Sequence, residues 1–173
     1  MLFRSGPLIN PAKPAYQLLG VFRPPWVRQL ANALNSLGLK GGLAVCCELH
    51  SGAFMDEFTT AGTNHVCGFG KMADIHKKWD PVELGFTPGS EEDLIGGTAA
   101  ENRAMLEDIL RGDARLGLVD ALVLNAAVAF KIVGKVDSLD EGCALAREVL
   151  LGGALREWLE KAAAFYTENG TGA

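Results

Sequence analysis

The sequence predicts an α/β domain in which a mostly parallel sheet is flanked by helices. A short apolar run is followed by an amphipathic segment and a second apolar run, which is the pattern of a β-α-β unit. The region after residue 97 shows helical periodicity instead, with two marked helix starts. With 173 residues, of which 49% are hydrophobic and 21% charged, the chain can bury one substantial core.

The predicted β-α-β unit occupies residues 16–49. Residues 16–22 (YQLLGVF) are short and apolar, as expected for a buried strand, and residues 43–49 (LAVCCEL) form a second one. Residues 26–37 place apolar side chains on one helical face, with Pro24 and Pro25 suited to the first turn and Gly38 to the end. The short links predict parallel pairing with a right-handed crossover. Proline-rich residues 6–15 predict an extended connector.

The remaining elements are indicated by strand propensity and by helix caps. Residues 51–97 are rich in Gly and Thr, and the best strand candidates there are residues 57–61, 65–69 and 72–79. Helices are predicted at residues 99–111, 117–133 and 139–166, because Thr98 and Ser138 each precede a glutamate three residues on, as in a capping box. The pair Gly152-Gly153 predicts a break in the last helix.

Charge and hydropathy exclude several classes of protein. Lys+Arg 16 against Asp+Glu 21 gives a net charge of −5 with no basic stripe, so no nucleic-acid partner is expected. The longest apolar stretch, residues 116–134, is interrupted by Asp120, Asn125 and Lys131, so no membrane span is predicted. The start lacks the pattern of a secretory signal, and the four cysteines show no Cys-x-x-Cys spacing. We therefore expect reduced thiols and a cytoplasmic protein.

The strongest candidate for chemistry is the adjacent pair Asp56-Glu57. It lies in a loop after a predicted strand, at the end of a parallel sheet where α/β proteins bind ligands. Two carboxylates at that edge could hold Mg²⁺, which prefers oxygen ligands and keeps water or phosphate in its remaining positions. On the residues alone, a solvated acidic turn is the favoured alternative.

Other polar residues give weaker signals. A transition-metal site would draw on the following histidines and cysteines: His50, His65, His76, Cys46, Cys47 and Cys67. None of these pairs has zinc-finger or i,i+4 helical spacing, so structural histidines are expected. Cys47 and His50 could act as nucleophile and base, but no third group is placed to orient them. Cys143 carries no motif of its own.

Three further features are interpreted as structural or surface features and not as functional sites. Gly96-Gly97 before the Thr98 cap could offer backbone amides to an anion, although such a pair more often makes a tight turn. Asn125 lies in the apolar segment LVLNAAVAF and is predicted to be a buried polar group that fixes helix packing. A small basic cluster is interpreted as a solvated surface and consists of Lys71, Lys77 and Lys78.

A series of short motifs runs through the chain in a fixed order. They are Gly6-Pro-Leu-Ile-Asn-Pro-Ala12, Leu19-Gly-Val21, Met55-Asp-Glu57, Asp80-Pro-Val-Glu-Leu-Gly85, Glu92-Asp-Leu-Ile-Gly-Gly97, Ala100-Glu-Asn102, Leu124-Asn-Ala-Ala127, Ser138-Leu-Asp-Glu-Gly142 and Ala144-Leu-Ala-Arg147. In order and spacing the chain resembles the C-terminal half of the anthranilate phosphoribosyltransferases. They are part of glycosyltransferase family 3, which also includes pyrimidine nucleoside phosphorylases.

The resemblance implies a fold, a reaction and a metal. The fold is the C-terminal part of a phosphoribosyltransferase/nucleoside-phosphorylase-like domain over residues 6–168, with residues 169–173 as a flexible tail. The reaction is phosphoribosyl transfer from phosphoribosyl pyrophosphate to anthranilate in tryptophan biosynthesis, with Mg²⁺ helping pyrophosphate to leave. Asp56 and Glu57 match the acidic-loop residues that bind one metal ion in the family, so the resemblance reverses the preference for a solvated turn.

The resemblance also limits what this chain is expected to do alone. The family's N-terminal helical domain and its substrate-binding residues would lie upstream of Gly6, so no catalytic residue is assigned and this chain alone is expected to be inactive. The homodimer of the family is implied only for the longer protein. Alternatives are a pyrimidine nucleoside phosphorylase or another member with a different acceptor, a non-catalytic nucleic-acid-binding relative, or a short chain that pairs with a separate subunit.

Two segments differ from the family pattern. In the acidic loop, Phe54 replaces a glycine, His50-Ser51 replaces His-Gly, and Gly62-Thr-Asn64 replaces Gly-Pro-Thr, so a changed loop geometry is expected. Residues 1–5 (MLFRS) are predicted to be a non-native start, because GTG CTC TTC CGA TCT, the tail of a common sequencing adapter, encodes them when it is read from an alternative GTG start codon. The alternative is that Leu2-Phe3 is native and Arg4-Ser5 is a shortened variant.

Overall fold

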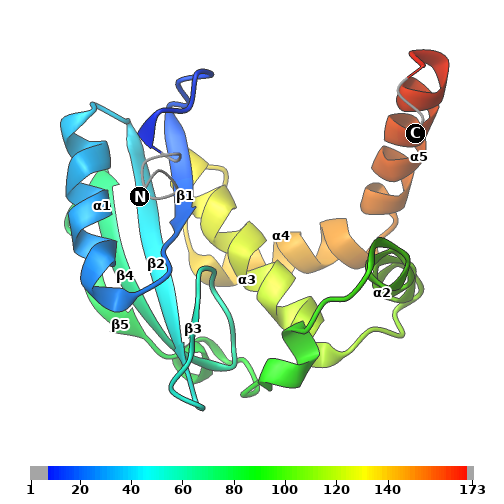
Figure 1. The fold of residues 1–173 in the computed structure, drawn as a ribbon, viewed down its shortest axis with the longest axis horizontal. Helices are drawn as coiled ribbons and strands as arrows, with labels where there is room; N and C mark the ends of the chain where they lie inside the picture. Colours follow the sequence, from blue (N-terminus) through cyan, green and yellow to red (C-terminus); the bar gives the residue numbers. More distant parts are fainter. Residues whose placement is uncertain (1–7, 171–173) are drawn as a thin grey trace.

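A five-stranded mixed sheet forms the centre of the chain, with helix α1 against one face and helix α3 against the other (Figure 1). This computed structural model describes residues 8–170; the expectations for residues 1–5 and for the tail beyond Gly170 lie outside them. The strands are β1 (Tyr16–Gly20), β2 (Gly41–Leu49), β3 (Phe54–Met55), β4 (Gly62–Gly70) and β5 (His76–Trp79). The longer helices are α1 (Pro24–Ser36), α2 (Ala99–Arg111), α3 (Leu116–Val133), α4 (Leu139–Leu151) and α5 (Ala154–Glu168).

The predicted β-α-β unit is confirmed. Strands β1 and β2 pair in parallel from Tyr16 opposite Gly41 to Gly20 opposite Val45, and α1 makes the crossover. Pro24 and Pro25 occupy the first turn of α1, where a missing N–H leaves no helical bond unmade. Alternate side chains of β2 face opposite sides of the sheet, so one set packs against α1 and the other against α3.

The α/β class with a flanked sheet is confirmed, but among the described strand pairs only β1 and β2 are parallel. Strands β2 and β4 are antiparallel, as are β4 and β5, and the short β3 folds back antiparallel onto β2. A parallel pair needs a long crossover, usually a helix. The segment between β2 and β4 contains only β3 and loops, so the chain returns in the opposite direction.

The structure differs from three predictions: the strands at residues 57–61 and 72–79, and the extended N-terminal connector. Residues 57–61 are not a strand, although Phe58, Thr59 and Thr60 are buried. Only His76–Trp79 of the predicted 72–79 strand is formed, because a turn occupies residues 71–74. Residues 8–15 are not simply extended, since the Lys13 N–H donates to the Asn10 carbonyl at 3.0 Å.

The helix starts and the predicted break are confirmed. Thr98 accepts from the Glu101 N–H, and the Glu101 carboxylate accepts from the Thr98 N–H at 2.7 Å, which completes a capping box at α2. At α4, the Ser138 hydroxyl accepts from the Glu141 N–H at 3.1 Å. The Glu141 carboxylate accepts from the Asp137 N–H rather than from the Ser138 N–H. The helix is interrupted at Gly152-Gly153, where Gly153 has φ 99°, and α5 then extends away from the sheet (Figure 1).

Helix α3 is the central element of the helical layer. It is long and apolar enough to cross a membrane by composition, but half of that window is buried within the chain. It contacts β1, β2 and α4, as expected of a core helix. Its buried Asp120 is paired with Arg147 of α4 at 2.6 Å, and the Arg147 guanidinium also lies over the Phe86 ring at 5.7 Å. This pair joins α3 to α4.

The Asp120–Arg147 pair predicts a measurable stability loss. Arg147→Met should lower the free energy of unfolding by about 2 kcal/mol, because it leaves a buried carboxylate without its charged partner. Urea denaturation would measure this loss. The double variant Asp120→Asn/Arg147→Met should recover part of it, since no buried charge is then left unpaired. Equal stability of Arg147→Met and the unaltered chain would contradict this assignment.

Candidate functional site

Asp56 and Glu57 lie at the carboxyl end of the parallel strand pair. Strand β3 pairs with the last part of β2, with Phe54 opposite Glu48, and the two acidic residues follow at once. The chain then passes against the end of β1, because a Cβ on Gly20 would lie 1.6 Å from the Asp56 carbonyl oxygen. Both acidic residues are exposed. The predicted position of the acidic loop is therefore the one observed.

Two asparagines hold the backbone just after the acidic pair. The Phe58 N–H donates to Asn125 Oδ1 at 3.2 Å, and Asn125 Nδ2 donates to the Phe58 carbonyl at 2.6 Å. One residue later, the Thr59 N–H donates to Asn64 Oδ1 at 3.1 Å, and Asn64 Nδ2 donates to the Thr59 carbonyl at 3.0 Å. The buried Phe58 ring also stacks on Trp79, with 5.4 Å between ring centroids. The loop is thus anchored to α3, β4 and β5.

The negative charges of Asp56 and Glu57 are not neutralised by a positively charged side chain of the described residues. Among residues 8–170, no side chain forms an ion pair or hydrogen bond with either carboxylate. Although Glu57 is exposed overall, protein on one side desolvates it, and this desolvation together with the Asp56 charge raises the pKa of the Glu57 carboxyl. Two neighbouring anions without a protein cation fit a bound cation.

The chemistry of this donor set matches a magnesium ion better than a transition metal. No group of three or more His, Cys, Asp or Glu side chains suited to a metal occurs in the described part of the chain. Mg²⁺ is commonly held by one or two carboxylates, with water and phosphate oxygens completing its shell. Asp56 and Glu57 could therefore hold Mg²⁺ jointly with a phosphorylated ligand.

The loop differs from the family pattern without strain at the altered residues. Phe54 lies in the extended strand β3, and Ser51 lies in a turn; neither has a positive φ. Gly52 has φ 85°, so the left-handed residue of this turn is a glycine one position later. The Ser51 N–H also donates to the Glu91 carboxylate at 3.1 Å. Ser51 and Phe54 therefore do not adopt a backbone conformation that requires glycine.

The cysteines do not have the character of nucleophiles. Burial, together with the charges on Asp56 and Glu48, raises the pKa of the Cys46 thiol to about 11. Burial raises the pKa of Cys47 to about 12, and it also raises the pKa of Cys67. These thiols stay protonated near neutral pH, whereas a nucleophilic cysteine needs a lowered pKa.

The histidines are dispersed. His65 Nε2 lies 2.8 Å from a Glu48 carboxylate oxygen, which pairs neighbouring strands β4 and β2. His50 and His76 are exposed, one after β2 and the other at the start of β5. His65 therefore has the structural contact expected of the histidines, whereas His50 and His76 lie on the surface.

The remaining candidates have local roles. The Gly97 N–H is already bound by Asn102 Oδ1 at 2.8 Å, so this amide serves the turn before α2. Lys71 and Lys77 lie over the rings of Tyr16 and Trp79 at 4.9 and 5.2 Å, and with Lys78 they are exposed. Asn125 differs most from expectation, because it is only half-buried and holds a loop rather than another helix.

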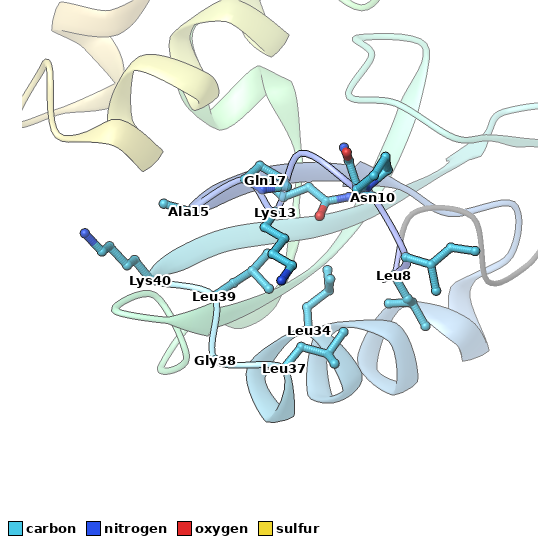
Figure 2. A pocket seen from close by; sticks show the side chains of 13 residues that line it. Leu8, Asn10, Lys13, Ala15, Gln17, Leu34, Leu37, Gly38, Leu39 and Lys40 are labelled. Carbon is cyan, nitrogen blue, oxygen red and sulfur yellow. The ribbon is translucent and has the colours of Figure 1, made fainter.

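A hollow lies at the end of the sheet opposite to the acidic loop. Its volume is about 610 Å³, and Figure 2 shows Leu34 of α1 and Leu37 just after that helix on one side of it, with Leu8 and Asn10 of the N-terminal segment nearby. Lys40, just before β2, lies on its rim. The lining contains no acidic residue. This hollow is at the amino ends of β1 and β2 and is separate from the acidic loop.

Comparison with known proteins decides the family. A family model described as "Glycosyl transferase family, a/b domain" matches residues 2–155. The chain belongs to this family. An anthranilate phosphoribosyltransferase from Deinococcus radiodurans is 37% identical over 156 residues, which are 90% of this chain and 45% of that protein. The enzyme of that name from Thermus thermophilus is 41% identical over 160 residues, covering 92% and 46%.

Solved members of the family share the fold. The crystal structure of anthranilate phosphoribosyltransferase from Thermus thermophilus aligns with a TM-score of 0.76 and 42% identity, over 92% of this chain and 46% of that one. The Saccharomyces cerevisiae enzyme in complex with PRPP and Mg aligns with a TM-score of 0.66 and 22% identity, over 82% and 40%. This chain spans a little under half the length of the relatives it matches.

Two positioning contacts escape prediction from the sequence. Gly20 inside a strand could have indicated a close backbone approach, and Asn64 is a fully buried polar residue in strand β4. Neither signal says which loop is approached or held. That information comes only from the fold.

The raised pKa of Glu57 predicts a stability gain on removal of its charge. Because the folded state binds this proton more tightly than the unfolded state, the ionised carboxylate destabilises the fold as pH rises through both pKa values. Glu57→Gln should therefore raise Tm at pH 7 and give no gain below about pH 4, where Glu57 is protonated in both states.

Thermal unfolding at both pH values measures the effect. Glu160→Gln on the exposed surface of α5 is the control for a change in net charge and should leave Tm nearly unchanged at pH 7. A Glu57→Gln variant that loses stability at pH 7 would contradict the electrostatic assignment.

Proposed function

We propose that this chain is part of a Mg²⁺-dependent anthranilate phosphoribosyltransferase in which Asp56 and Glu57 hold the metal ion. The observation that carries the proposal is the acidic pair itself: two carboxylates without a cationic partner in the described chain, fixed at the carboxyl edge of the sheet. Membership of the glycosyl transferase family and the 34–41% identity to enzymes of that name support it.

The reaction needs charge stabilisation on its leaving group. The bond from the anomeric carbon of the ribose to pyrophosphate breaks, a bond to the anthranilate amine forms, and the amine gives up a proton. Bound Mg²⁺ would neutralise the growing charge on pyrophosphate. The role of this chain is to hold the two carboxylates in place, so that no reorganisation is needed as that charge develops.

The proposed substrates come from relatives, not from contacts in this chain. A yeast protein of the same fold forms a complex with PRPP and Mg, and another structure of it contains 4-fluoroanthranilate. We accordingly propose phosphoribosyl pyrophosphate and anthranilate as donor and acceptor, and a cytoplasmic location. A pyrimidine nucleoside phosphorylase or another family member with a different acceptor is the second candidate. The net charge of −5 disfavours a nucleic-acid-binding relative.

A segment exchange tests the proposal. This chain would replace the matched 160-residue segment of the Thermus thermophilus enzyme, and consumption of anthranilate would be followed by its fluorescence with PRPP and Mg²⁺. We expect Mg²⁺-dependent turnover, and a loss of kcat/KM of about 100-fold or more in the Asp56→Asn/Glu57→Gln form, because the ligands of the metal are removed.

The control is the same exchange carrying Glu160→Gln, which removes one carboxylate from the exposed surface of α5. It should retain most of the activity. A folded exchange protein whose turnover is unaffected by loss of both Asp56 and Glu57 carboxylates would overturn the metal assignment.

A further inference from the structure

We propose that Asn125 is the positioning residue of the acidic loop: from helix α3 it fixes the backbone that follows Asp56 and Glu57, so that both carboxylates are presented to one cation. The inference rests on the proposed function for the identity of the cation, but its structural content concerns the loop itself. Asn125 does not touch the ion or the substrate; it acts through Phe58.

The geometry of Asn125 is that of a two-sided clamp on one residue. Its Oδ1 accepts from the Phe58 N–H at 3.2 Å, and its Nδ2 donates to the Phe58 carbonyl at 2.6 Å. The same Nδ2 donates to the Ala121 carbonyl one helical turn earlier at 2.8 Å, which fixes the side chain on α3. Three of the four hydrogen bonds that an asparagine side chain can form are therefore committed to this arrangement.

The clamp is needed because no strand pairing holds this segment. Residues 57–61 lie between β3 and β4 and form no ladder, yet Phe58 and Thr59 are fully buried. A buried backbone amide or carbonyl must find a partner, and Asn125 supplies both for Phe58. Asn64 supplies both for Thr59 from β4, so the two asparagines hold consecutive residues from different elements.

The acidic pair would otherwise tend to leave the sheet edge. Asp56 and Glu57 carry like charges on adjacent residues, and no side chain of the described residues pairs with either of them. Gly20 leaves just enough room for the Asp56 carbonyl to approach β1. Because Asn125 holds the Phe58 backbone on both sides, it restricts the backbone of the preceding residue, Glu57, at the sheet edge.

Asn102 provides a matched control within the same chain. Its Oδ1 accepts from the Gly97 N–H at 2.8 Å, and its Nδ2 donates to the Gly97 carbonyl at 3.1 Å. The bonding pattern is that of Asn125 around Phe58, but Asn102 serves an exposed turn before α2 and holds no part of the acidic loop. Loss of either side chain removes two backbone hydrogen bonds; only the loss of Asn125 should change cation binding.

The experiment uses the full 173-residue chain with Mn²⁺ as the probe. Broadening of the Asp56 and Glu57 amide signals by Mn²⁺ gives the binding midpoint, and amide hydrogen exchange gives the order of the loop. Asn125→Ala should speed exchange of the Phe58 amide, and of the Asp56 and Glu57 amides, by about tenfold or more and should raise the Mn²⁺ midpoint by about tenfold. Asn102→Ala should speed exchange at Gly97 and leave the Mn²⁺ midpoint unchanged.

Two further variants separate the possible failures. Asn125→Leu has a similar length, adds no charge and loses the three hydrogen bonds of Asn125. It replaces Asn125→Ala if that variant does not fold, and it should also weaken Mn²⁺ binding. If Asp56→Asn/Glu57→Gln binds Mn²⁺ as the unaltered chain does, the proposed metal site is wrong, and loop exchange alone decides the role of Asn125. An unchanged Mn²⁺ midpoint in a folded Asn125 variant, or unchanged exchange at Asp56 and Glu57, would overturn the inference.

Discussion

The arrangement of the site depends on how the buried backbone of Phe58 and Thr59 is satisfied. In most of a sheet these groups would bond to a neighbouring strand, but here side-chain amides from α3 and β4 take that place. A strand at residues 57–61 would point successive side chains to opposite faces. The loop held by asparagines instead leaves both Asp56 and Glu57 exposed at one edge.

The hydrogen bonds that hold this loop also keep the like charges of Asp56 and Glu57 side by side, where a bound cation can relieve their repulsion. Asp56 and Glu57 lie beside each other without a paired cationic side chain from the described residues, and burial together with the Asp56 charge raises the pKa of the Glu57 carboxyl and of the Cys46 thiol. By contrast, the buried carboxylate of Asp120 has Arg147 as its partner. Arg147 thus neutralises Asp120 where helices α3 and α4 pack, whereas Asp56 and Glu57 remain available to bind a cation.

The sequence predicts those parts of the fold that local rules determine. The Thr98–Glu101 and Ser138–Glu141 pairs place two helix starts, and Gly152-Gly153 places the break, because caps and glycines act within a few residues. The direction of β4 and the conformation of residues 57–61 depend on distant partners. Phe58-Thr59-Thr60 has strand propensity, but Asn125, 67 residues from Phe58, determines its conformation. The acidic pair is identified through its motif, and Asn125 is identified as a structural residue, but the sequence does not predict that Asn125 and Asn64 bind the backbone of Phe58 and Thr59.

A crystal structure of the chain grown with Mn²⁺ and pyrophosphate, with the ion located by its anomalous signal, would test the metal site without recourse to activity. We predict a single Mn²⁺ ion within about 2.5 Å of carboxylate oxygens of both Asp56 and Glu57, with the Phe58 backbone still bound by Asn125. An ion bound elsewhere, with both carboxylates directed into solvent, would contradict the assignment.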